Sequence, residues 1–505
     1  MKSYKKLFFQ YSSPRLEEFV SEWTKHRAQH AISNQRDFDE LKLELPFEGI
    51  ASQPKDMGEI VEELKSVLLP GSVNMSSPYF IGHMTTHLPN FVFPIAQLLV
   101  ALNQNVVKEE TSKVLTLYER KLIAEMHQLI YGGPRGFYQQ RVFDKNETLG
   151  IVCSGGTLAN ISALLCARNK AFPQWKEIGM NTFNSTIPVI ICSERAHYSM
   201  EKAARMLGLG SKCLQKIPVD RNQKMRIDLL EMKLKECYRN KRSIIALVGV
   251  AGTTECGSID PLFEMAQLAQ QYKTHFHVDA AWGGAFLFSK RRAVLFKGIE
   301  MADTVTLDPH KQLYVPMGMG MLFFKDPHLA DEMELTAEYT IRKNSFDLGQ
   351  RSFEGSRPAH ALYLKMNLDM LGKSGYAQLV DDSADLARKF AEMIYLSEDF
   401  QLLIRPELNI ILYRYLPKEY RDLQPKDFTA EINEQIDQMN LDLQKRQFLS
   451  GRTFVSRTHL CIKRFGENPI TCLRVVLANP MTEVLHLEEV LNHQREIVKA
   501  IVNSG

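Results

Sequence analysis

The run Thr304-Val305-Thr306-Leu307-Asp308-Pro309-His310-Lys311 has the pattern of a short buried strand that stops at charged residues. An upstream run of the same form ends its apolar part at Asp279: His275-Phe276-His277-Val278-Asp279-Ala280-Ala281-Trp282-Gly283-Gly284. A carboxylate and an amine at the ends of neighbouring buried strands are costly unless a further group pairs with them. Pyridoxal phosphate would do so, because a lysine condenses with its aldehyde and an aspartate pairs with its ring nitrogen. The two runs therefore predict a cofactor site at one edge of a buried sheet.

Short apolar runs alternate with helical patterns on both sides of these strands, from about residue 148 to residue 325. We expect strands at 149–152, 187–191 and 243–250, followed by helices at 158–172, 198–207 and 261–272. Asp260-Pro261 is typical of a helix start, with aspartate as the N-cap and proline in the first turn. Strands that alternate with helices predict an α/β fold with a large, mostly parallel, doubly wound sheet.

The pattern changes towards both ends of the chain and predicts three parts. Residues 1–80 form a polar helical segment, and residues 81–375 form the large cofactor-binding domain, in which a long helical pattern from 92 to 131 is broken near 103–105. In residues 376–505 helices and strands are mixed, including a helix expected at 425–444. This indicates a smaller α+β domain.

The composition excludes several classes of protein. The formal net charge is only +3, which gives no reason to expect nucleic acid or a membrane surface as a partner. No window is long and apolar enough for a membrane span, and the apolar patch near the N-terminus is too short for a signal peptide. The eight cysteines are scattered without C-x-x-C spacing. They predict reduced thiols in a cytoplasmic protein, with no metal site.

Further polar groups follow the other predicted strands. The turn Ser154-Gly155-Gly156-Thr157 precedes a helix, and its glycines and free amides favour an anion such as a phosphate, although such turns are often only tight connections. His197 and Thr254 stand in the same position after later strands, where open α/β sheets bind ligands. Each has an ordinary interpretation, as a capping histidine or a polar turn. Five such segments in this order predict one shared site.

These segments together resemble the group II pyridoxal phosphate-dependent amino acid decarboxylases. The resemblance rests on Ser154-Gly155-Gly156-Thr157-x-Ala159-Asn160, His197, Gly252-Thr253-Thr254, Asp279-Ala280-Ala281-Trp282-Gly283-Gly284 and Asp308-x-His310-Lys311, within a match from about Pro78 to Pro480. That family includes decarboxylases of glutamate, aromatic amino acids, cysteine sulfinate and aspartate. The resemblance implies a fold-type I enzyme.

The resemblance also implies a role for each residue. Lys311 would hold the cofactor covalently, Asp279 would keep its ring nitrogen protonated, and His197 and Ala281 would cover the two faces of its ring. The remaining cofactor contacts would be Ser154, Gly155, Gly156, Thr157, Thr254, His310 and Ser356. Ser356 would reach the phosphate of a partner subunit, since sites in this family form between the two chains of a homodimer, which the N-terminal segment would help to form.

The resemblance extends to substrate binding and proton transfer. Arg474 matches an arginine that binds the α-carboxylate of the substrate, and its planar fork suits a carboxylate. An arginine inside an apolar strand also needs an anionic partner. Tyr339, in a polar loop from 335 to 358, matches a tyrosine that delivers a proton when the loop closes.

The identity of the substrate depends on less specific segments. His83, Thr85 and Asn105 could recognise a short distal carboxylate, and their surroundings resemble those of bacterial aspartate 1-decarboxylases, which make β-alanine. Glutamate is the second choice, although glutamate decarboxylases have glutamine where this chain has His83. Two other classes remain open: a sulfur-transfer lyase of the same fold, and a catalytically silent dimer that binds pyridoxal phosphate.

Overall fold

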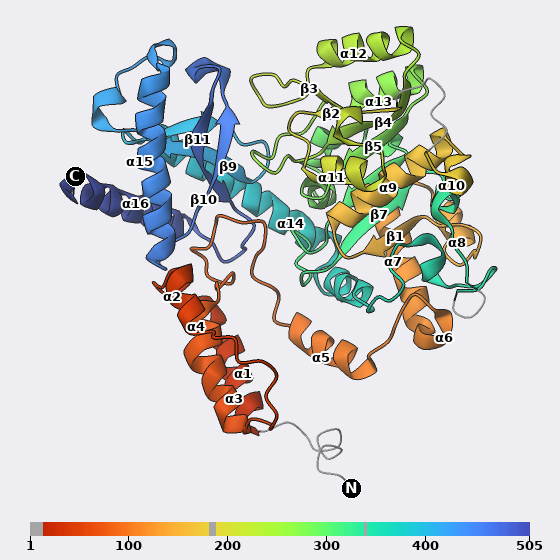
Figure 1. The fold of residues 1–505 in the computed structure, drawn as a ribbon, viewed down its shortest axis with the longest axis horizontal. Helices are drawn as coiled ribbons and strands as arrows, with labels where there is room; N and C mark the ends of the chain where they lie inside the picture. Colours follow the sequence, from red (N-terminus) through yellow and green to blue (C-terminus); the bar gives the residue numbers. More distant parts are fainter. Residues whose placement is uncertain (1–13, 181–187, 338–340, 505) are drawn as a thin grey trace. The chain divides into compact units, whose positions relative to one another are not determined.

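The structure is a computed structural model that describes residues 14–180, 188–337 and 341–504. These residues fall into two compact units, each described here by itself (Figure 1). The large unit comprises residues 88–392 and 404–412, and the small unit comprises the residues up to 87, 393–403 and those from 413 onwards. The division into three parts at residues 80 and 375 stays a prediction.

The large unit is built on a seven-stranded sheet with the order β1-β7-β6-β5-β4-β2-β3. Neighbours from β6 to β3 pair in parallel, while β7 is antiparallel to both β6 and β1. The strands are β1 (Gly150–Cys153), β2 (Pro188–Ser193), β3 (Leu214–Ile217), β4 (Ser243–Val250), β5 (His275–Asp279), β6 (Thr304–Leu307) and β7 (Gly320–Phe324). The prediction of a mostly parallel, doubly wound sheet is confirmed.

Helices cover both faces of this sheet because alternate residues of a strand point to opposite sides. On β4, Ala246 and Val248 belong to an apolar cluster with α9 and α11, whereas a Cβ at Gly249 would lie 2.8 Å from Leu262 of α13. The helices of this unit are α5 (Val92–Leu102), α6 (Glu109–Ser112), α7 (Val114–Tyr131), α8 (Arg135–Arg141), α9 (Gly156–Ala171), α10 (Trp175–Ile178), α11 (Ser199–Met206), α12 (Ile227–Arg239), α13 (Leu262–Gln271) and α14 (Ala361–Tyr395).

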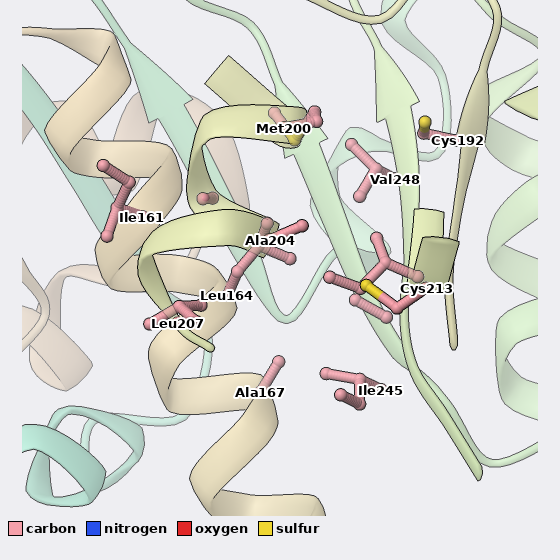
Figure 2. Packing of buried hydrophobic residues seen from close by; sticks show 13 residues of the cluster. Ile161, Leu164, Ala167, Cys192, Met200, Ala204, Leu207, Cys213, Ile245 and Val248 are labelled. Carbon is pink, nitrogen blue, oxygen red and sulfur yellow. The ribbon is translucent and has the colours of Figure 1, made fainter. Parts of the chain in front are cut away.

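The cluster between α9, α11 and the sheet fixes the two helices that follow β1 and β2. Figure 2 shows Ile161 and Leu164 of α9 beside Met200 and Ala204 of α11, with Val248 of β4 in the same cluster. All of these side chains are buried. Burial of an aliphatic side chain contributes about 1.5–3 kcal/mol, so this cluster holds the loops at the starts of both helices in place.

The break expected near 103–105 is confirmed but is longer than expected, strand β7 was missed, and the expected cap at Asp260 is wrong. The helical pattern from 92 to 131 forms two long helices, α5 and α7, and the break extends from 103 to 113, with the short helix α6 inside it. Strand β7 was not expected, because its short apolar run follows closely on the lysine loop. Asp260 does not cap α13: its carboxylate accepts hydrogen bonds from the backbone amides of Met225 (2.8 Å) and Val250 (2.9 Å).

The small unit carries a four-stranded sheet with the order β10-β11-β9-β8. The strands of this sheet are β8 (Phe400–Ile404), β9 (Ile410–Tyr415), β10 (Ser456–Cys461) and β11 (Pro469–Val476), of which residues 404 and 410–412 are counted with the large unit. The helices of the small unit are α1 (Pro14–His26), α2 (Phe38–Leu43), α3 (Met57–Glu63), α4 (Leu69–Gly71), α15 (Ala430–Leu449) and α16 (Val484–Ser504). Helix α15 starts later than expected because the Thr429 hydroxyl caps it by accepting from Ile432 N. Among the described residues, no helix combines the length and apolar composition that a membrane crossing needs.

Candidate active site

A cavity of about 600 Å³ opens in the large unit at the ends of β1, β2, β4, β5 and β6. Strands β4, β5 and β6 end level with one another, since Val250, Asp279 and Thr306 are paired in register. Ten of the residues predicted to contact the cofactor line this cavity: Ser154, Gly155, Gly156, Thr157, His197, Thr254, Asp279, Ala281, His310 and Lys311.

The glycine turn lies at the start of α9, where the first amides of a helix have no partner within the helix. Gly156 is packed tightly against the loop that carries the lysine: a Cβ here would lie 2.6 Å from Asp308 Oδ2. A Cβ at Gly320 of β7 would likewise lie 2.5 Å from the carbonyl carbon of Gly155. The turn therefore needs Gly156 and the neighbouring Gly320 to present its amides to the cavity.

Asp279 is a buried carboxylate that also faces the cavity. Its Oδ1 accepts from Ala281 N at 3.1 Å, and its Oδ2 accepts from Asn160 Nδ2 at 2.9 Å. Among the described residues it forms no ion pair within 4.0 Å. Two hydrogen bonds hold this carboxylate in place and leave its charge available to a cationic group in the cavity.

His197 lies between β2 and α11, and Ser199, the first residue of α11, holds its ring in place. Its Nδ1 lies 2.8 Å from Ser199 Oγ and 3.3 Å from Ser199 N. Burial lowers the pKa of His197, and the neighbouring Asp279 carboxylate opposes this effect. The His197 imidazole is therefore neutral at pH 7, which suits stacking on the aromatic ring of a cofactor.

The amine of Lys311 lies 3.2 Å from Asp308 Oδ2, and both side chains line the cavity. His310 donates from Nδ1 to the carbonyl of Met319 at 2.6 Å, so its Nε2 faces Asp308 at 3.8 Å. The sequence interpretation gave Asp308 no role. The sequence could have indicated a role, because Asp308 is an acidic residue directly after a buried strand and one turn before the lysine.

These residues fit pyridoxal phosphate. The α9 turn offers amides and hydroxyls to a phosphate, Asp279 offers an unneutralised carboxylate to a protonated ring nitrogen, and Lys311 offers an amine on the same cavity. Such a charge-assisted hydrogen bond contributes about 1.5–3 kcal/mol.

Ser356 and Asn105 do not line this cavity. Instead they contact each other, with Asn105 Nδ2 donating to Ser356 Oγ at 3.4 Å. Asn105 Oδ1 also accepts from Arg357 N at 3.0 Å, and Val106 N donates to Arg357 O. The segments around 105 and 357 thus form one hydrogen-bonded surface feature of the large unit.

Three of the predicted substrate residues come together within the small unit. Arg474 is a buried residue of β11, and its Nη1 donates to Gly82 O at 3.2 Å and to Ser456 Oγ at 3.3 Å. Gly82 begins the loop that carries His83 and Thr85, whose Nδ1 and Oγ1 lie 3.1 Å apart. Tyr339 lies outside the described residues.

The chain matches the family model described as "Pyridoxal-dependent decarboxylase conserved domain" over residues 42–416. It is 40% identical to aspartate 1-decarboxylase of Aliivibrio fischeri, over 97% of this chain and 90% of that protein. It is 28% identical to L-2,4-diaminobutyrate decarboxylase of Acinetobacter baumannii, over 90% of this chain and 88% of that protein.

A solved structure has the same fold. The crystal structure of mouse CSAD superimposes with a TM-score of 0.84, at 22% identity, over 96% of this chain and 99% of that one. The cavity at the strand ends and these matches lead to one conclusion: the chain is a fold-type I, pyridoxal phosphate-dependent carboxy-lyase and belongs to the pyridoxal-dependent decarboxylase family.

Proposed function

We propose that this decarboxylase converts L-aspartate to β-alanine and carbon dioxide. The observation that carries the proposal is the 40% identity, along nearly the whole chain, to a protein named aspartate 1-decarboxylase. Relatives named acidic amino acid decarboxylase, at 29% identity in Homo sapiens, support an acidic substrate in general.

The proposed residue roles follow from the groups on the cavity. Lys311 holds the cofactor, Asp279 keeps a proton on its ring nitrogen, and the α9 turn binds its phosphate. When bound, the cofactor supplies an electron sink for the pair left on Cα as carbon dioxide departs. Tyr339 delivers the proton that replaces the carboxylate on Cα, a role that rests on the family resemblance.

Substrate binding is assigned to the cluster in the small unit. Arg474 binds the α-carboxylate through its planar guanidinium, and the linked loop brings the His83 and Thr85 side chains to the distal carboxylate. The hydrogen bond from Arg474 to the Gly82 carbonyl supports this grouping, because it couples the arginine to that loop.

The enzyme is proposed to act as a homodimer in the cytoplasm. The Asn105–Ser356 feature, which does not line the cavity of its own chain, contributes to the phosphate and substrate sites of the partner subunit. Eight cysteines without a disulfide suit a reducing compartment.

A substrate panel tests the proposal. Purified enzyme loaded with the cofactor is given labelled L-aspartate, L-glutamate, cysteine sulfinate and L-2,4-diaminobutyrate, and released carbon dioxide is measured. We expect L-aspartate to have the highest kcat/KM and β-alanine to be the product. Faster turnover of L-glutamate would overturn the substrate assignment, and no carbon dioxide from any substrate would favour a silent dimer.

A further inference from the structure

A buried hydrogen-bond chain runs along the wall of the cavity, and Asn160 of α9, which lines the cavity, is at its centre. Asn160 Nδ2 donates to Asp279 Oδ2 at 2.9 Å and to Ser199 Oγ at 3.0 Å. Its Oδ1 lies 3.0 Å from His277 Nε2. One side chain, only 1% exposed, therefore uses both amide protons and its oxygen.

On the side of the sheet, the partners of Asn160 determine which atom donates and which accepts in each hydrogen bond. Since the amide oxygen can only accept, His277 Nε2 carries a proton. Burial lowers the pKa of His277 to about 4, so the ring is neutral at pH 7 and its Nδ1 accepts from Thr304 Oγ1 at 2.9 Å. The Thr304 hydroxyl has one proton, and so His275 Nε2 donates to Thr304 Oγ1 at 2.8 Å.

The other branch sets the proton position on His197. Ser199 Oγ accepts from Asn160 and directs its own proton at His197 Nδ1, which also receives Ser199 N–H. A ring nitrogen that accepts two such donors carries no proton. The proton of the neutral ring is therefore on Nε2.

We propose that Asn160 is a positioning residue that sets two cofactor-facing groups at once, the carboxylate of Asp279 and the tautomer of His197. The Asp279 carboxylate, which can only accept, keeps the amide in this orientation. In the flipped orientation, Asn160 Oδ1 would face the Asp279 carboxylate and its Nδ2 would face the His277 N–H, so two like groups would oppose each other. The inference rests on the roles proposed above for Asp279 and His197.

Asn160→Ala tests this inference, with Asn169→Ala as the matched control. Asn169 is also a buried asparagine on α9, but its Nδ2 donates to the Glu332 carbonyl, away from the cavity. The readouts are the Kd of the apoenzyme for pyridoxal phosphate, the absorption spectrum of the bound cofactor, the ¹⁵N shifts of the His197 ring and the melting temperature.

For Asn160→Ala we expect a Kd at least about tenfold higher, because a hydrogen bond to a charged carboxylate is lost. We also expect a changed cofactor spectrum and a mixture of His197 tautomers. Asn169→Ala should lower the melting temperature without changing the other three readouts. The inference is overturned when both variants lower only the melting temperature.

Thr304→Val provides a second test when Asn160→Ala does not fold. It preserves the shape of the side chain and removes the hydroxyl that donates to His277 and accepts from His275, so we expect a rise in Kd of about two- to tenfold and the same spectral change. An unchanged Kd and spectrum would overturn the inference. Because these readouts need no substrate, they stand apart from the outcome of the carbon dioxide assay.

Discussion

The Lys311 amine forms an ion pair with Asp308, at 3.2 Å between Nζ and Oδ2, across a single turn after β6. The carboxylate is buried and the lysine is mostly buried, so the turn holds the amine at the cavity instead of in solvent. This geometry gives the amine a defined place on the cavity, as its proposed role in holding the cofactor requires.

Lys311→Ala should remove covalent attachment of the cofactor and nearly all decarboxylation, because the amine that Asp308 holds on the cavity is lost. Borohydride reduction followed by mass spectrometry measures the attachment. Lys311→Arg retains a positive charge beside Asp308 but forms no imine, and should fail in the same way. A cofactor adduct retained in either variant would remove Lys311 from its proposed role.

Gly156→Ala should weaken cofactor binding because the new methyl group would lie 2.6 Å from Asp308 Oδ2. Either the α9 turn or the carboxylate has to move, at a cost of about 1–3 kcal/mol for overpacking. Titration of the apoenzyme with pyridoxal phosphate measures the loss. Gly136→Ala is the control, since nothing lies within 4 Å of a Cβ in that helix and its stability should be unchanged or higher.

Arg357→Met should strongly destabilise the large unit. Arg357 and Glu119 form a bidentate ion pair with side chains only 5% and 1% exposed. Removal of the arginine leaves a buried unpaired carboxylate and costs about 3–5 kcal/mol. Urea unfolding measures this loss, and the double variant Arg357→Met/Glu119→Leu should recover most of it. A double variant no more stable than the single one would contradict this account.

Arg474→Lys should raise KM for the amino acid substrate by about tenfold or more and change kcat less, because a lysine cannot form the bidentate contact with a carboxylate. Steady-state kinetics with L-aspartate checks this expectation. Arg457→Lys on the neighbouring strand β10 is the control, since that side chain is exposed and should leave KM unchanged. Equal effects of the two substitutions would argue against substrate contact by Arg474.

The main features of the fold and the cavity could be predicted because they follow from local patterns. Asp279 and Lys311 both follow short apolar runs, and parallel strands that end in register bring such residues to one edge. The role of Asp260 could not be predicted in this way. Its amide partners, Met225 and Val250, are 35 and 10 residues away in the sequence, so only the folded chain reveals them.

The hydrogen bonds around Asn160 could likewise be predicted only in part from the sequence. His277 and Asp279 are two residues apart on β5 and therefore share a face, which the sequence could indicate. That Asn160 of α9 lies between their side chains depends on how the helix packs on the sheet, and this packing is set by apolar residues distant in sequence, such as Leu164 and Val248.

A pH dependence of stability is expected from His127. Burial lowers the pKa of His127 from 6.5 to about 4, and its two ring nitrogens contact the Tyr138 hydroxyl and the Phe324 carbonyl. Above pH 6.5 the ring is neutral in both the folded and the unfolded chain. As the pH falls towards 4, only the unfolded chain takes up the proton, so stability is lost, on the order of 3 kcal/mol in total.

His127→Phe should therefore be less stable than the parent at pH 7, because it loses two buried hydrogen bonds, but should lose less stability between pH 6.5 and pH 4. Urea unfolding midpoints across this range measure both effects. Tyr138→Phe removes one partner and preserves the imidazole, so it should retain the dependence of the parent protein. If His127→Phe kept that dependence as well, His127 would not be among the groups responsible for it.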